Sequence, residues 1–232
     1  MPKFVPKTKR ELQELISDES MYLGDIDTSN ITDMSRLFFE DENKDEIHRL
    51  DFSGISSWDV SKVTDMSHMF EHCYVFNENI SSWDVSSVKN MERMFDECNF
   101  FAQDISSWDV SGCENMSGMF SGCYAFNQPL NSWNVSKVRD MIGMFHSCYY
   151  FNQPLDNWDV SSVEFMSFMF DTALSFNADI SGWNVGRFTS VRSMFCCAKS
   201  FKQDISGWKL ADERKKELHK GRNRYKYYDR NE

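Results

Sequence analysis

Residues 83–108 read WDVSSVKNMERMFDECNFFAQDISSW, and the tryptophans at the two ends of this stretch stand 25 residues apart. The same interval separates all the tryptophans of the chain, which are Trp58, Trp83, Trp108, Trp133, Trp158, Trp183 and Trp208. Valine, methionine, phenylalanine and isoleucine or leucine recur at the same interval between them. A fixed period of about 20–50 residues is typical of repeat proteins, in which each repeat buries its apolar residues only against its neighbours.

The spacing of apolar residues changes along one repeat. Trp83 and Val85 alternate as the residues of a short strand do. Val88, Met91 and Met94 then follow at steps of three, which favours a helix or a 3₁₀ turn. We therefore expect an α/β repeat solenoid in which each 25-residue coil has one short parallel strand plus one short helix or 3₁₀ turn, with helical caps at both ends.

The tryptophan column is the expected centre of stability. Stacked coils would turn this column into a continuous internal ladder. A buried tryptophan removes about 150–250 Å² from water, which corresponds to about 4–6 kcal/mol before the entropy of ordering is subtracted. Replacing Trp133, in the middle of the ladder, should therefore destabilise the fold more than replacing Trp208 at its end.

The repeat divides a single solenoid domain into four parts. From the amino terminus these are a capping segment (1–25), a divergent first repeat with a charged insertion (26–57), six 25-residue repeats (58–207), and a half-repeat with a basic helical tail (208–232). Thr8–Glu11 has the pattern of a helix capping box. The insertion at 40–46 is expected to form an exposed bulge, and residues 211–232 carry a net charge of +3.

The consensus of the repeat is WDVSxVxxMxxMFxxCxxFNQPL, which runs with variations from Asp25 to Trp208. This motif resembles the BspA-like repeats of bacterial surface proteins, which are about 25 residues long and related to leucine-rich repeats. The resemblance implies a leucine-rich-repeat-like fold, with Ile80, Trp83 and Val85 in a strand on the concave side. It also implies protein–protein or adhesive interaction, no enzymatic activity and a cell-surface location.

The charge balance narrows the classes of partner. The formal net charge is −11, which argues against nucleic acid because phosphate binding requires a cationic surface. No run approaches the ~18 consecutive apolar residues of a membrane span, and the amino-terminal residues lack the apolar stretch of a secretory signal. The lack of a signal disagrees with the surface location that the resemblance implies, so the sequence fixes no compartment.

One polar column, between the tryptophan and the valine, is the candidate interaction face. Its members are Asp59, Asp84, Asp109, Asn134, Asp159 and Asn184. Alternation along the expected strand points these side chains away from the tryptophans. Two interpretations stay open: each oxygen accepts backbone amides at a turn, or the column forms a binding face for basic partners or calcium.

Cysteine and histidine give weaker indications of chemistry. Four of the seven cysteines share one column, namely Cys73, Cys98, Cys123 and Cys148. Later coils place Ala173 and Ala198 there, so we interpret the column as small buried thiols rather than disulfides. His68 and His72 beside Cys73 superficially resemble zinc ligands, but no other coil repeats them, and surface histidines are the better interpretation.

We therefore expect a monomeric, non-enzymatic protein-interaction or adhesin-like module that presents its solenoid surface to a protein partner and uses no metal or cofactor. A structural subunit that assembles end to end is the alternative. A cation-binding or enzymatic site in the 40–50 insertion or the basic tail, outside the regular repeats, is the least favoured hypothesis. The sequence does not identify the partner.

Overall fold

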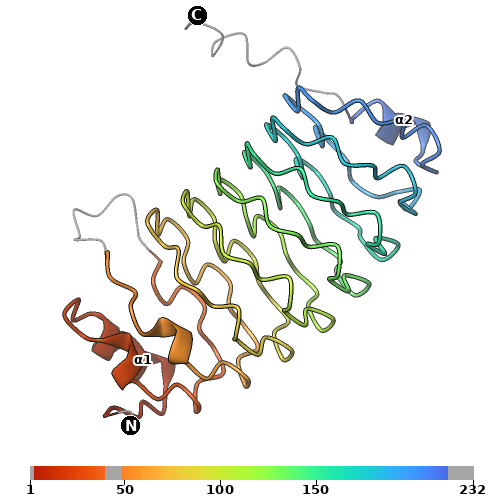
Figure 1. The fold of residues 1–232 in the computed structure, drawn as a ribbon. Helices are drawn as coiled ribbons and strands as arrows, with labels where there is room; N and C mark the ends of the chain where they lie inside the picture. The colour runs from red at the N-terminus through yellow and green to blue at the C-terminus, as the bar shows by residue number, and fades with distance from the viewer. Residues whose placement is uncertain (1–2, 40–48, 219–232) are drawn as a thin grey trace, which may run out of the picture.

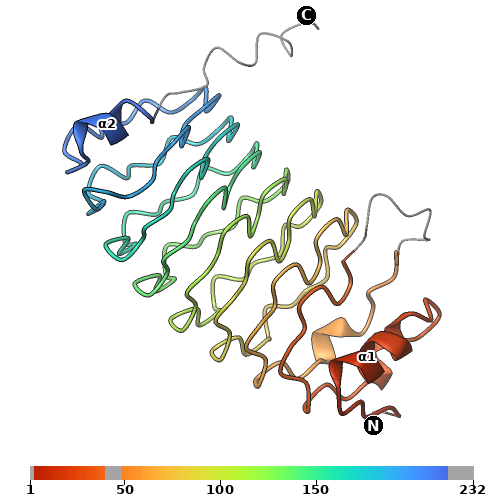
Figure 2. The same ribbon diagram turned by 180° about the vertical axis from the view of Figure 1, so that it is seen from behind.

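A computed structural model describes residues 3–39 and 49–218 of the chain. The backbone winds into coils that stack along one axis, with the amino-terminal and carboxyl-terminal ends at opposite ends of the stack (Figure 1). The view from behind shows the same regular succession of coils (Figure 2). Equivalent positions of successive coils therefore lie beside one another, as the 25-residue period predicts.

The expected α/β architecture, with a leucine-rich-repeat-like strand and helix in each coil, is wrong. The helical elements of the described residues are α1 (Lys9–Ile16), η1 (Leu23–Asp25), η2 (Ile55–Ser57) and α2 (Asp212–Lys215). From Trp58 to Trp208, a stretch that is described throughout, no residue is helical. Strand pairing there is limited to single-residue parallel bridges, such as Asp65 to Asn90.

The backbone-to-backbone hydrogen bonds between the repeated coils lie outside the stretch predicted as a strand. Trp83 donates its backbone N–H to Ile80 within the same coil, and Val88 donates to Val85, so both segments are turns. Alternate backbone amides of the segment after these turns donate to the next coil. In the coil that begins at Trp58, these bonds are 2.7–2.9 Å long and run from Met66 to Asn90, His68 to Glu92, Phe70 to Met94 and His72 to Asp96. We call the surface formed by residues 65–72 and the equivalent residues of later coils the ladder face.

The predicted helix is replaced by successive tight turns. Met94 donates its N–H to Met91 and Cys98 donates to Phe95, three residues back rather than the four of an α-helix. Two columns of residues have the left-handed backbone conformation, which interrupts any helix. The columns are His68, Arg93, Gly118, Gly143, Phe168 and Ser193, and His72, Glu97, Gly122, Ser147, Thr172 and Cys197.

The core consists of parallel ladders of identical side chains. The rings of the column that includes Phe95 and Phe120 stack at 5.6–5.9 Å between centroids from one coil to the next. The tryptophans are buried, and each indole N–H donates to a backbone carbonyl of an earlier coil at 2.9–3.3 Å. The ladders therefore satisfy the polar atom of each indole as well as burying its rings.

Short helices stand at the two ends of the described stack. Thr8 accepts the backbone N–H of Glu11 at 3.2 Å, and the Glu11 carboxylate accepts the N–H of Lys7, so the amino end of α1 is capped. Leu12 and Ile16 of α1 are buried. The insertion at 40–46 and the tail beyond residue 218 lie outside the described residues. None of the described helices is long and apolar enough to cross a membrane.

Candidate functional site

The predicted interaction column is exposed, and its oxygens are engaged in turns. Asp59, Asp84, Asp109, Asn134, Asp159 and Asn184 are all exposed. The Oδ1 atom of each of the first five accepts the backbone N–H of the serine two residues later at 3.0–3.1 Å. This arrangement agrees with the Asx-turn interpretation of the column. Its role in binding a partner stays a prediction.

The turns also explain the electrostatics of this column. Hydrogen bonds from the serine hydroxyl and then from the serine backbone hold the pKa of Asp59, Asp109 and Asp159 below the ordinary value. Hydrogen bonds to the charged form favour that form. These carboxylates therefore stay ionised without requiring a bound cation.

A groove crosses the ladder face where two coils carry glycine. It has a volume of about 500 Å³ and extends over four successive coils. Its lining consists of Glu92, Arg93, Asp96, Ser117, Gly118, Ser121, Asp140, Ile142, Gly143, His146, Phe168 and Asp171. Gly118 and Gly143 occupy a column that holds Arg93 in the coil before them and Phe168 in the coil after them. The missing side chains open the groove, which we call the glycine groove.

Charged and apolar side chains both line the glycine groove. Arg93 contacts the carboxylates of Glu71 and Asp96 at 3.2 Å in each case. Among the apolar lining residues, Phe168 is 38% exposed and Ile142 is 37% exposed. The groove therefore offers both a polar and an apolar surface to a bound segment.

Three carboxyl groups of the groove, those of Asp96, Asp140 and Asp171, are poorly solvated. Burial raises the pKa of Asp96, while its hydrogen bond with Ser121 and the charge of Arg93 act in the opposite direction. Burial also raises the pKa of Asp140, and the nearby Glu92 carboxylate raises it further. Partial burial disfavours the ionised form, so a cation entering the groove would relieve this cost.

The histidines and the cysteine singled out in the sequence do not converge. His68 Nδ1 lies 2.6 Å from a Glu71 carboxylate oxygen. The His72 ring stacks on Tyr74 at 6.2 Å. The Cys73 thiol donates to the backbone carbonyl of Phe38 at 3.1 Å. These three side chains therefore have separate partners.

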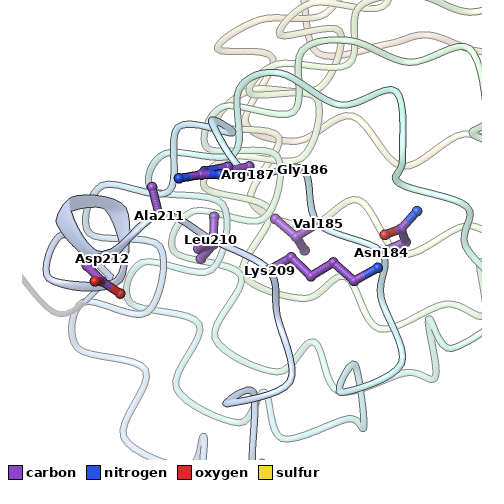
Figure 3. A pocket seen from close by; sticks show the side chains of 8 residues that line it. All are labelled: Asn184, Val185, Gly186, Arg187, Lys209, Leu210, Ala211 and Asp212. Carbon is purple, nitrogen blue, oxygen red and sulfur yellow. The ribbon is translucent and has the colours of Figure 1, made fainter.

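A second hollow, of about 490 Å³, lies at the carboxyl-terminal coil between residues 184–187 and 209–212. Figure 3 shows the Lys209 side chain extended toward Asn184 across it. Gly186 stands where earlier coils carry the serine of the Asx turn. Arg187 also lines this hollow, so it is more basic than the glycine groove.

The sequence indicates the glycine groove only indirectly. Two adjacent coils replace a bulky residue of one column with Gly118 and Gly143, which breaks the repeat at the surface while the buried columns continue.

Asparagine side chains form a further ladder between coils, which the sequence did not lead us to expect. Asn127 accepts the backbone N–H of Asn152, and Asn152 accepts that of Asn177, at 2.9 and 2.8 Å.

A family model described as "Mycoplasma protein of unknown function, DUF285" matches residues 10–128, 44–156 and 129–222. The matches follow one another along the chain and overlap, in agreement with a repeat protein. No curated protein and no solved structure matches the chain.

Proposed function

The chain belongs to the DUF285 family of Mycoplasma proteins of unknown function, and we propose that it is a non-enzymatic interaction module that binds a basic segment of a partner protein in the glycine groove. The observation that carries the proposal is the pair of partly buried carboxyl groups, Asp96 and Asp140, in an open groove. Groups with perturbed pKa values that line a concavity are candidates for functional sites.

The chemistry of the groove specifies the kind of segment that would bind. A lysine or arginine would pair with the carboxylates of Asp140 and Glu92 and relieve their mutual repulsion. An apolar residue beside it would cover the exposed Phe168 ring, because aromatic side chains at such positions are common anchors of interfaces. The net charge of −11 would speed the approach of a basic partner.

The resemblance of the repeat to BspA-like surface-protein repeats also supports an interaction role. Repeat proteins present extended surfaces built from many short units, and they bind partners through surface residues that vary while the core repeats. The glycine groove fits this description because its residues differ from coil to coil, while the phenylalanine and methionine columns beneath it do not.

A groove-filling variant tests the proposal. Phe168 shows that this column accepts a phenylalanine, so Gly143→Phe should fill the groove with a side chain that the next coil already carries. The matched control is Gly143→Ala. Alanine has to adopt the same left-handed backbone conformation as phenylalanine at this position, but its small side chain leaves the groove open. Its added Cβ would lie 3.7 Å from the nearest atom, His146 Cβ.

The measurement is fluorescence anisotropy with a panel of labelled peptides that combine lysine or arginine with an aliphatic or aromatic residue. We expect peptides of this class to bind the wild type and Gly143→Ala, to bind Gly143→Phe at least about tenfold more weakly, and to be released by salt. Failure of the whole panel to bind would overturn the proposal. Binding that survives in Gly143→Phe and is lost in an Asp84→Asn, Asp109→Asn variant would instead assign recognition to the aspartate column.

A further inference from the structure

A cluster of metal-ligating side chains lies where the last coils meet the glycine groove. Asp171, Cys196 and Cys197 each place one ligand atom within 4.8 Å of the other two. The two sulfur atoms are 3.6 Å apart. Consecutive residues of an extended chain point to opposite sides, but Cys197 has a φ of +58°, and this left-handed conformation accompanies the approach of the two thiols.

His146, in the coil before Asp171, lies next to this cluster, although its ring nitrogens are not within 4.8 Å of all three ligand atoms. Its Nδ1 atom is buried and has no hydrogen-bond partner, and Asp171 Oδ2 lies 3.7 Å away, beyond hydrogen-bond reach. The other ring nitrogen, Nε2, lies 3.3 Å from the Ser147 hydroxyl. A metal-binding histidine commonly donates its second N–H to such a neighbour, which leaves the first nitrogen's lone pair for the ion.

We propose that Asp171, Cys196 and Cys197 bind one zinc-like divalent cation, with His146 as the fourth ligand once its ring turns toward the thiols. Zinc prefers four tetrahedral ligands of these types, with Zn–S near 2.3 Å and Zn–N and Zn–O near 2.1 Å. A tetrahedron with these bond lengths separates two sulfurs by about 3.8 Å, and a nitrogen from an oxygen by about 3.4 Å. The observed 3.6 and 3.7 Å lie within a few tenths of an ångström of those values.

The surrounding coils support a specific role for the two thiols. Cysteines of the buried column have a different environment, since Cys123 and Cys148 donate to the backbone carbonyls of Phe95 and Phe120 at 3.0 and 2.9 Å. Cys196 and Cys197 lie outside that column, in two slots that hold Ser121 and Ser147 in other coils. Binding would release both thiol protons to solvent, because the ligands are thiolates, and no redox step is involved.

Cobalt(II) is the probe, because tetrahedral thiolate sites give it intense visible absorption and a near-ultraviolet thiolate-to-cobalt charge-transfer band. The test titrates the reduced, full-length chain with Co²⁺ and then displaces the cobalt with Zn²⁺. The key variant is Cys196→Ser, Cys197→Ser, which uses residues that the equivalent slots already accept. The matched control is Cys148→Ala, because Ala173 and Ala198 stand in the same column.

We expect both bands to develop with one equivalent of Co²⁺ in the wild type and in Cys148→Ala, and to be lost in the double serine variant. His146→Ser, which copies Ser121, should weaken Co²⁺ binding at least about tenfold. Circular dichroism establishes that each variant is folded. Absence of the charge-transfer band from the wild type, or its persistence in the double serine variant, would overturn the proposal. His146 and Asp171 also line the glycine groove, whereas the two cysteines do not, so the double serine variant removes cation binding without changing any residue that lines the groove for a peptide.

Discussion

Trp133 donates its indole N–H to the backbone carbonyl oxygen of Ile105, 3.1 Å away in the preceding coil. The same bond recurs from Trp158 to Leu130 at 2.9 Å and from Trp183 to Leu155 at 2.9 Å. Each tryptophan therefore fixes its coil to the one before it through a directional contact as well as through apolar burial. The bond holds the coils in register, because a slip of one residue would leave a buried donor unpaired.

Replacing Trp133 with phenylalanine should lower the free energy of unfolding by about 2–4 kcal/mol, because the change leaves a cavity and removes the partner of a buried carbonyl. Trp208→Phe is the matched change at the last tryptophan, which has a repeated coil on one side only. It should lower the free energy of unfolding by a smaller amount. Urea unfolding followed by circular dichroism measures both. Equal losses at the two positions would contradict the view that the middle of the ladder couples the two halves of the stack.

The left-handed columns predict opposite effects for two glycine-to-alanine changes. Gly143 has a φ of +59° and space for a Cβ, so Gly143→Ala should cost about 1–2 kcal/mol from backbone conformation alone. Gly182 lies outside the left-handed region, and nothing lies within 4 Å of its added Cβ. Gly182→Ala should therefore be neutral or stabilising by up to about 1 kcal/mol. Thermal unfolding compares them, and a loss at Gly182 as large as that at Gly143 would contradict the explanation.

The buried columns could be predicted from the sequence, whereas the backbone path between them could not. Every tryptophan of the 25-residue series is buried, because apolar periodicity reports which side chains lie inside. The steps of three from Val88 to Met94 favour a helix, but a chain of three-residue turns produces the same spacing. Gly118 and Gly122 lie in the stretch that the spacing predicts as a helix, and they argue against a helix there because glycine is a poor helix former.

The candidate sites were harder to predict because they depend on how unlike residues meet across coils. The aspartate column was visible as a repeated feature, and its turns follow from aspartate or asparagine two residues before serine. His146 and Asp171 are 25 residues apart and share one column, but their column holds a different residue in nearly every coil. The 25-residue period does not reveal such a column, because its residues do not repeat. Repeat proteins nevertheless place their functional residues in positions that vary.

The asparagine ladder predicts a difference between two substitutions of Asn152. Asn152→Ala removes the acceptor of the Asn177 N–H and should cost about 0.5–1.5 kcal/mol. Asn152→Asp keeps an oxygen in the same place and should retain most of that stability at neutral pH. Urea unfolding of the two variants separates loss of the hydrogen bond from change of the side chain. A loss in the aspartate variant that matches the alanine variant would count against the ladder.

Asp140 should lower the stability of the fold at neutral pH. Burial raises its pKa above the ordinary 3.8, and Glu92 adds to the effect. A carboxyl group whose pKa is raised by folding contributes stability that is fully present below the unfolded-state pKa and is lost as the pH rises through the folded-state pKa. Asp140→Asn keeps the oxygen that accepts the Ile142 N–H, as Asn115 does for Ser117 in the preceding coil. The variant should therefore be more stable than the wild type at neutral pH.

The pH dependence distinguishes this electrostatic effect from a change in packing. The gain in Asp140→Asn should disappear as the pH falls below about 3.8, where the wild-type carboxyl group is protonated in both states. Asp109→Asn is the control of opposite sign, because Ser111 holds the pKa of Asp109 below its ordinary value. That variant should gain nothing at neutral pH. Urea unfolding across the acidic range measures both, and a gain in Asp140→Asn that persists at low pH would show that the carboxylate's charge is not its source.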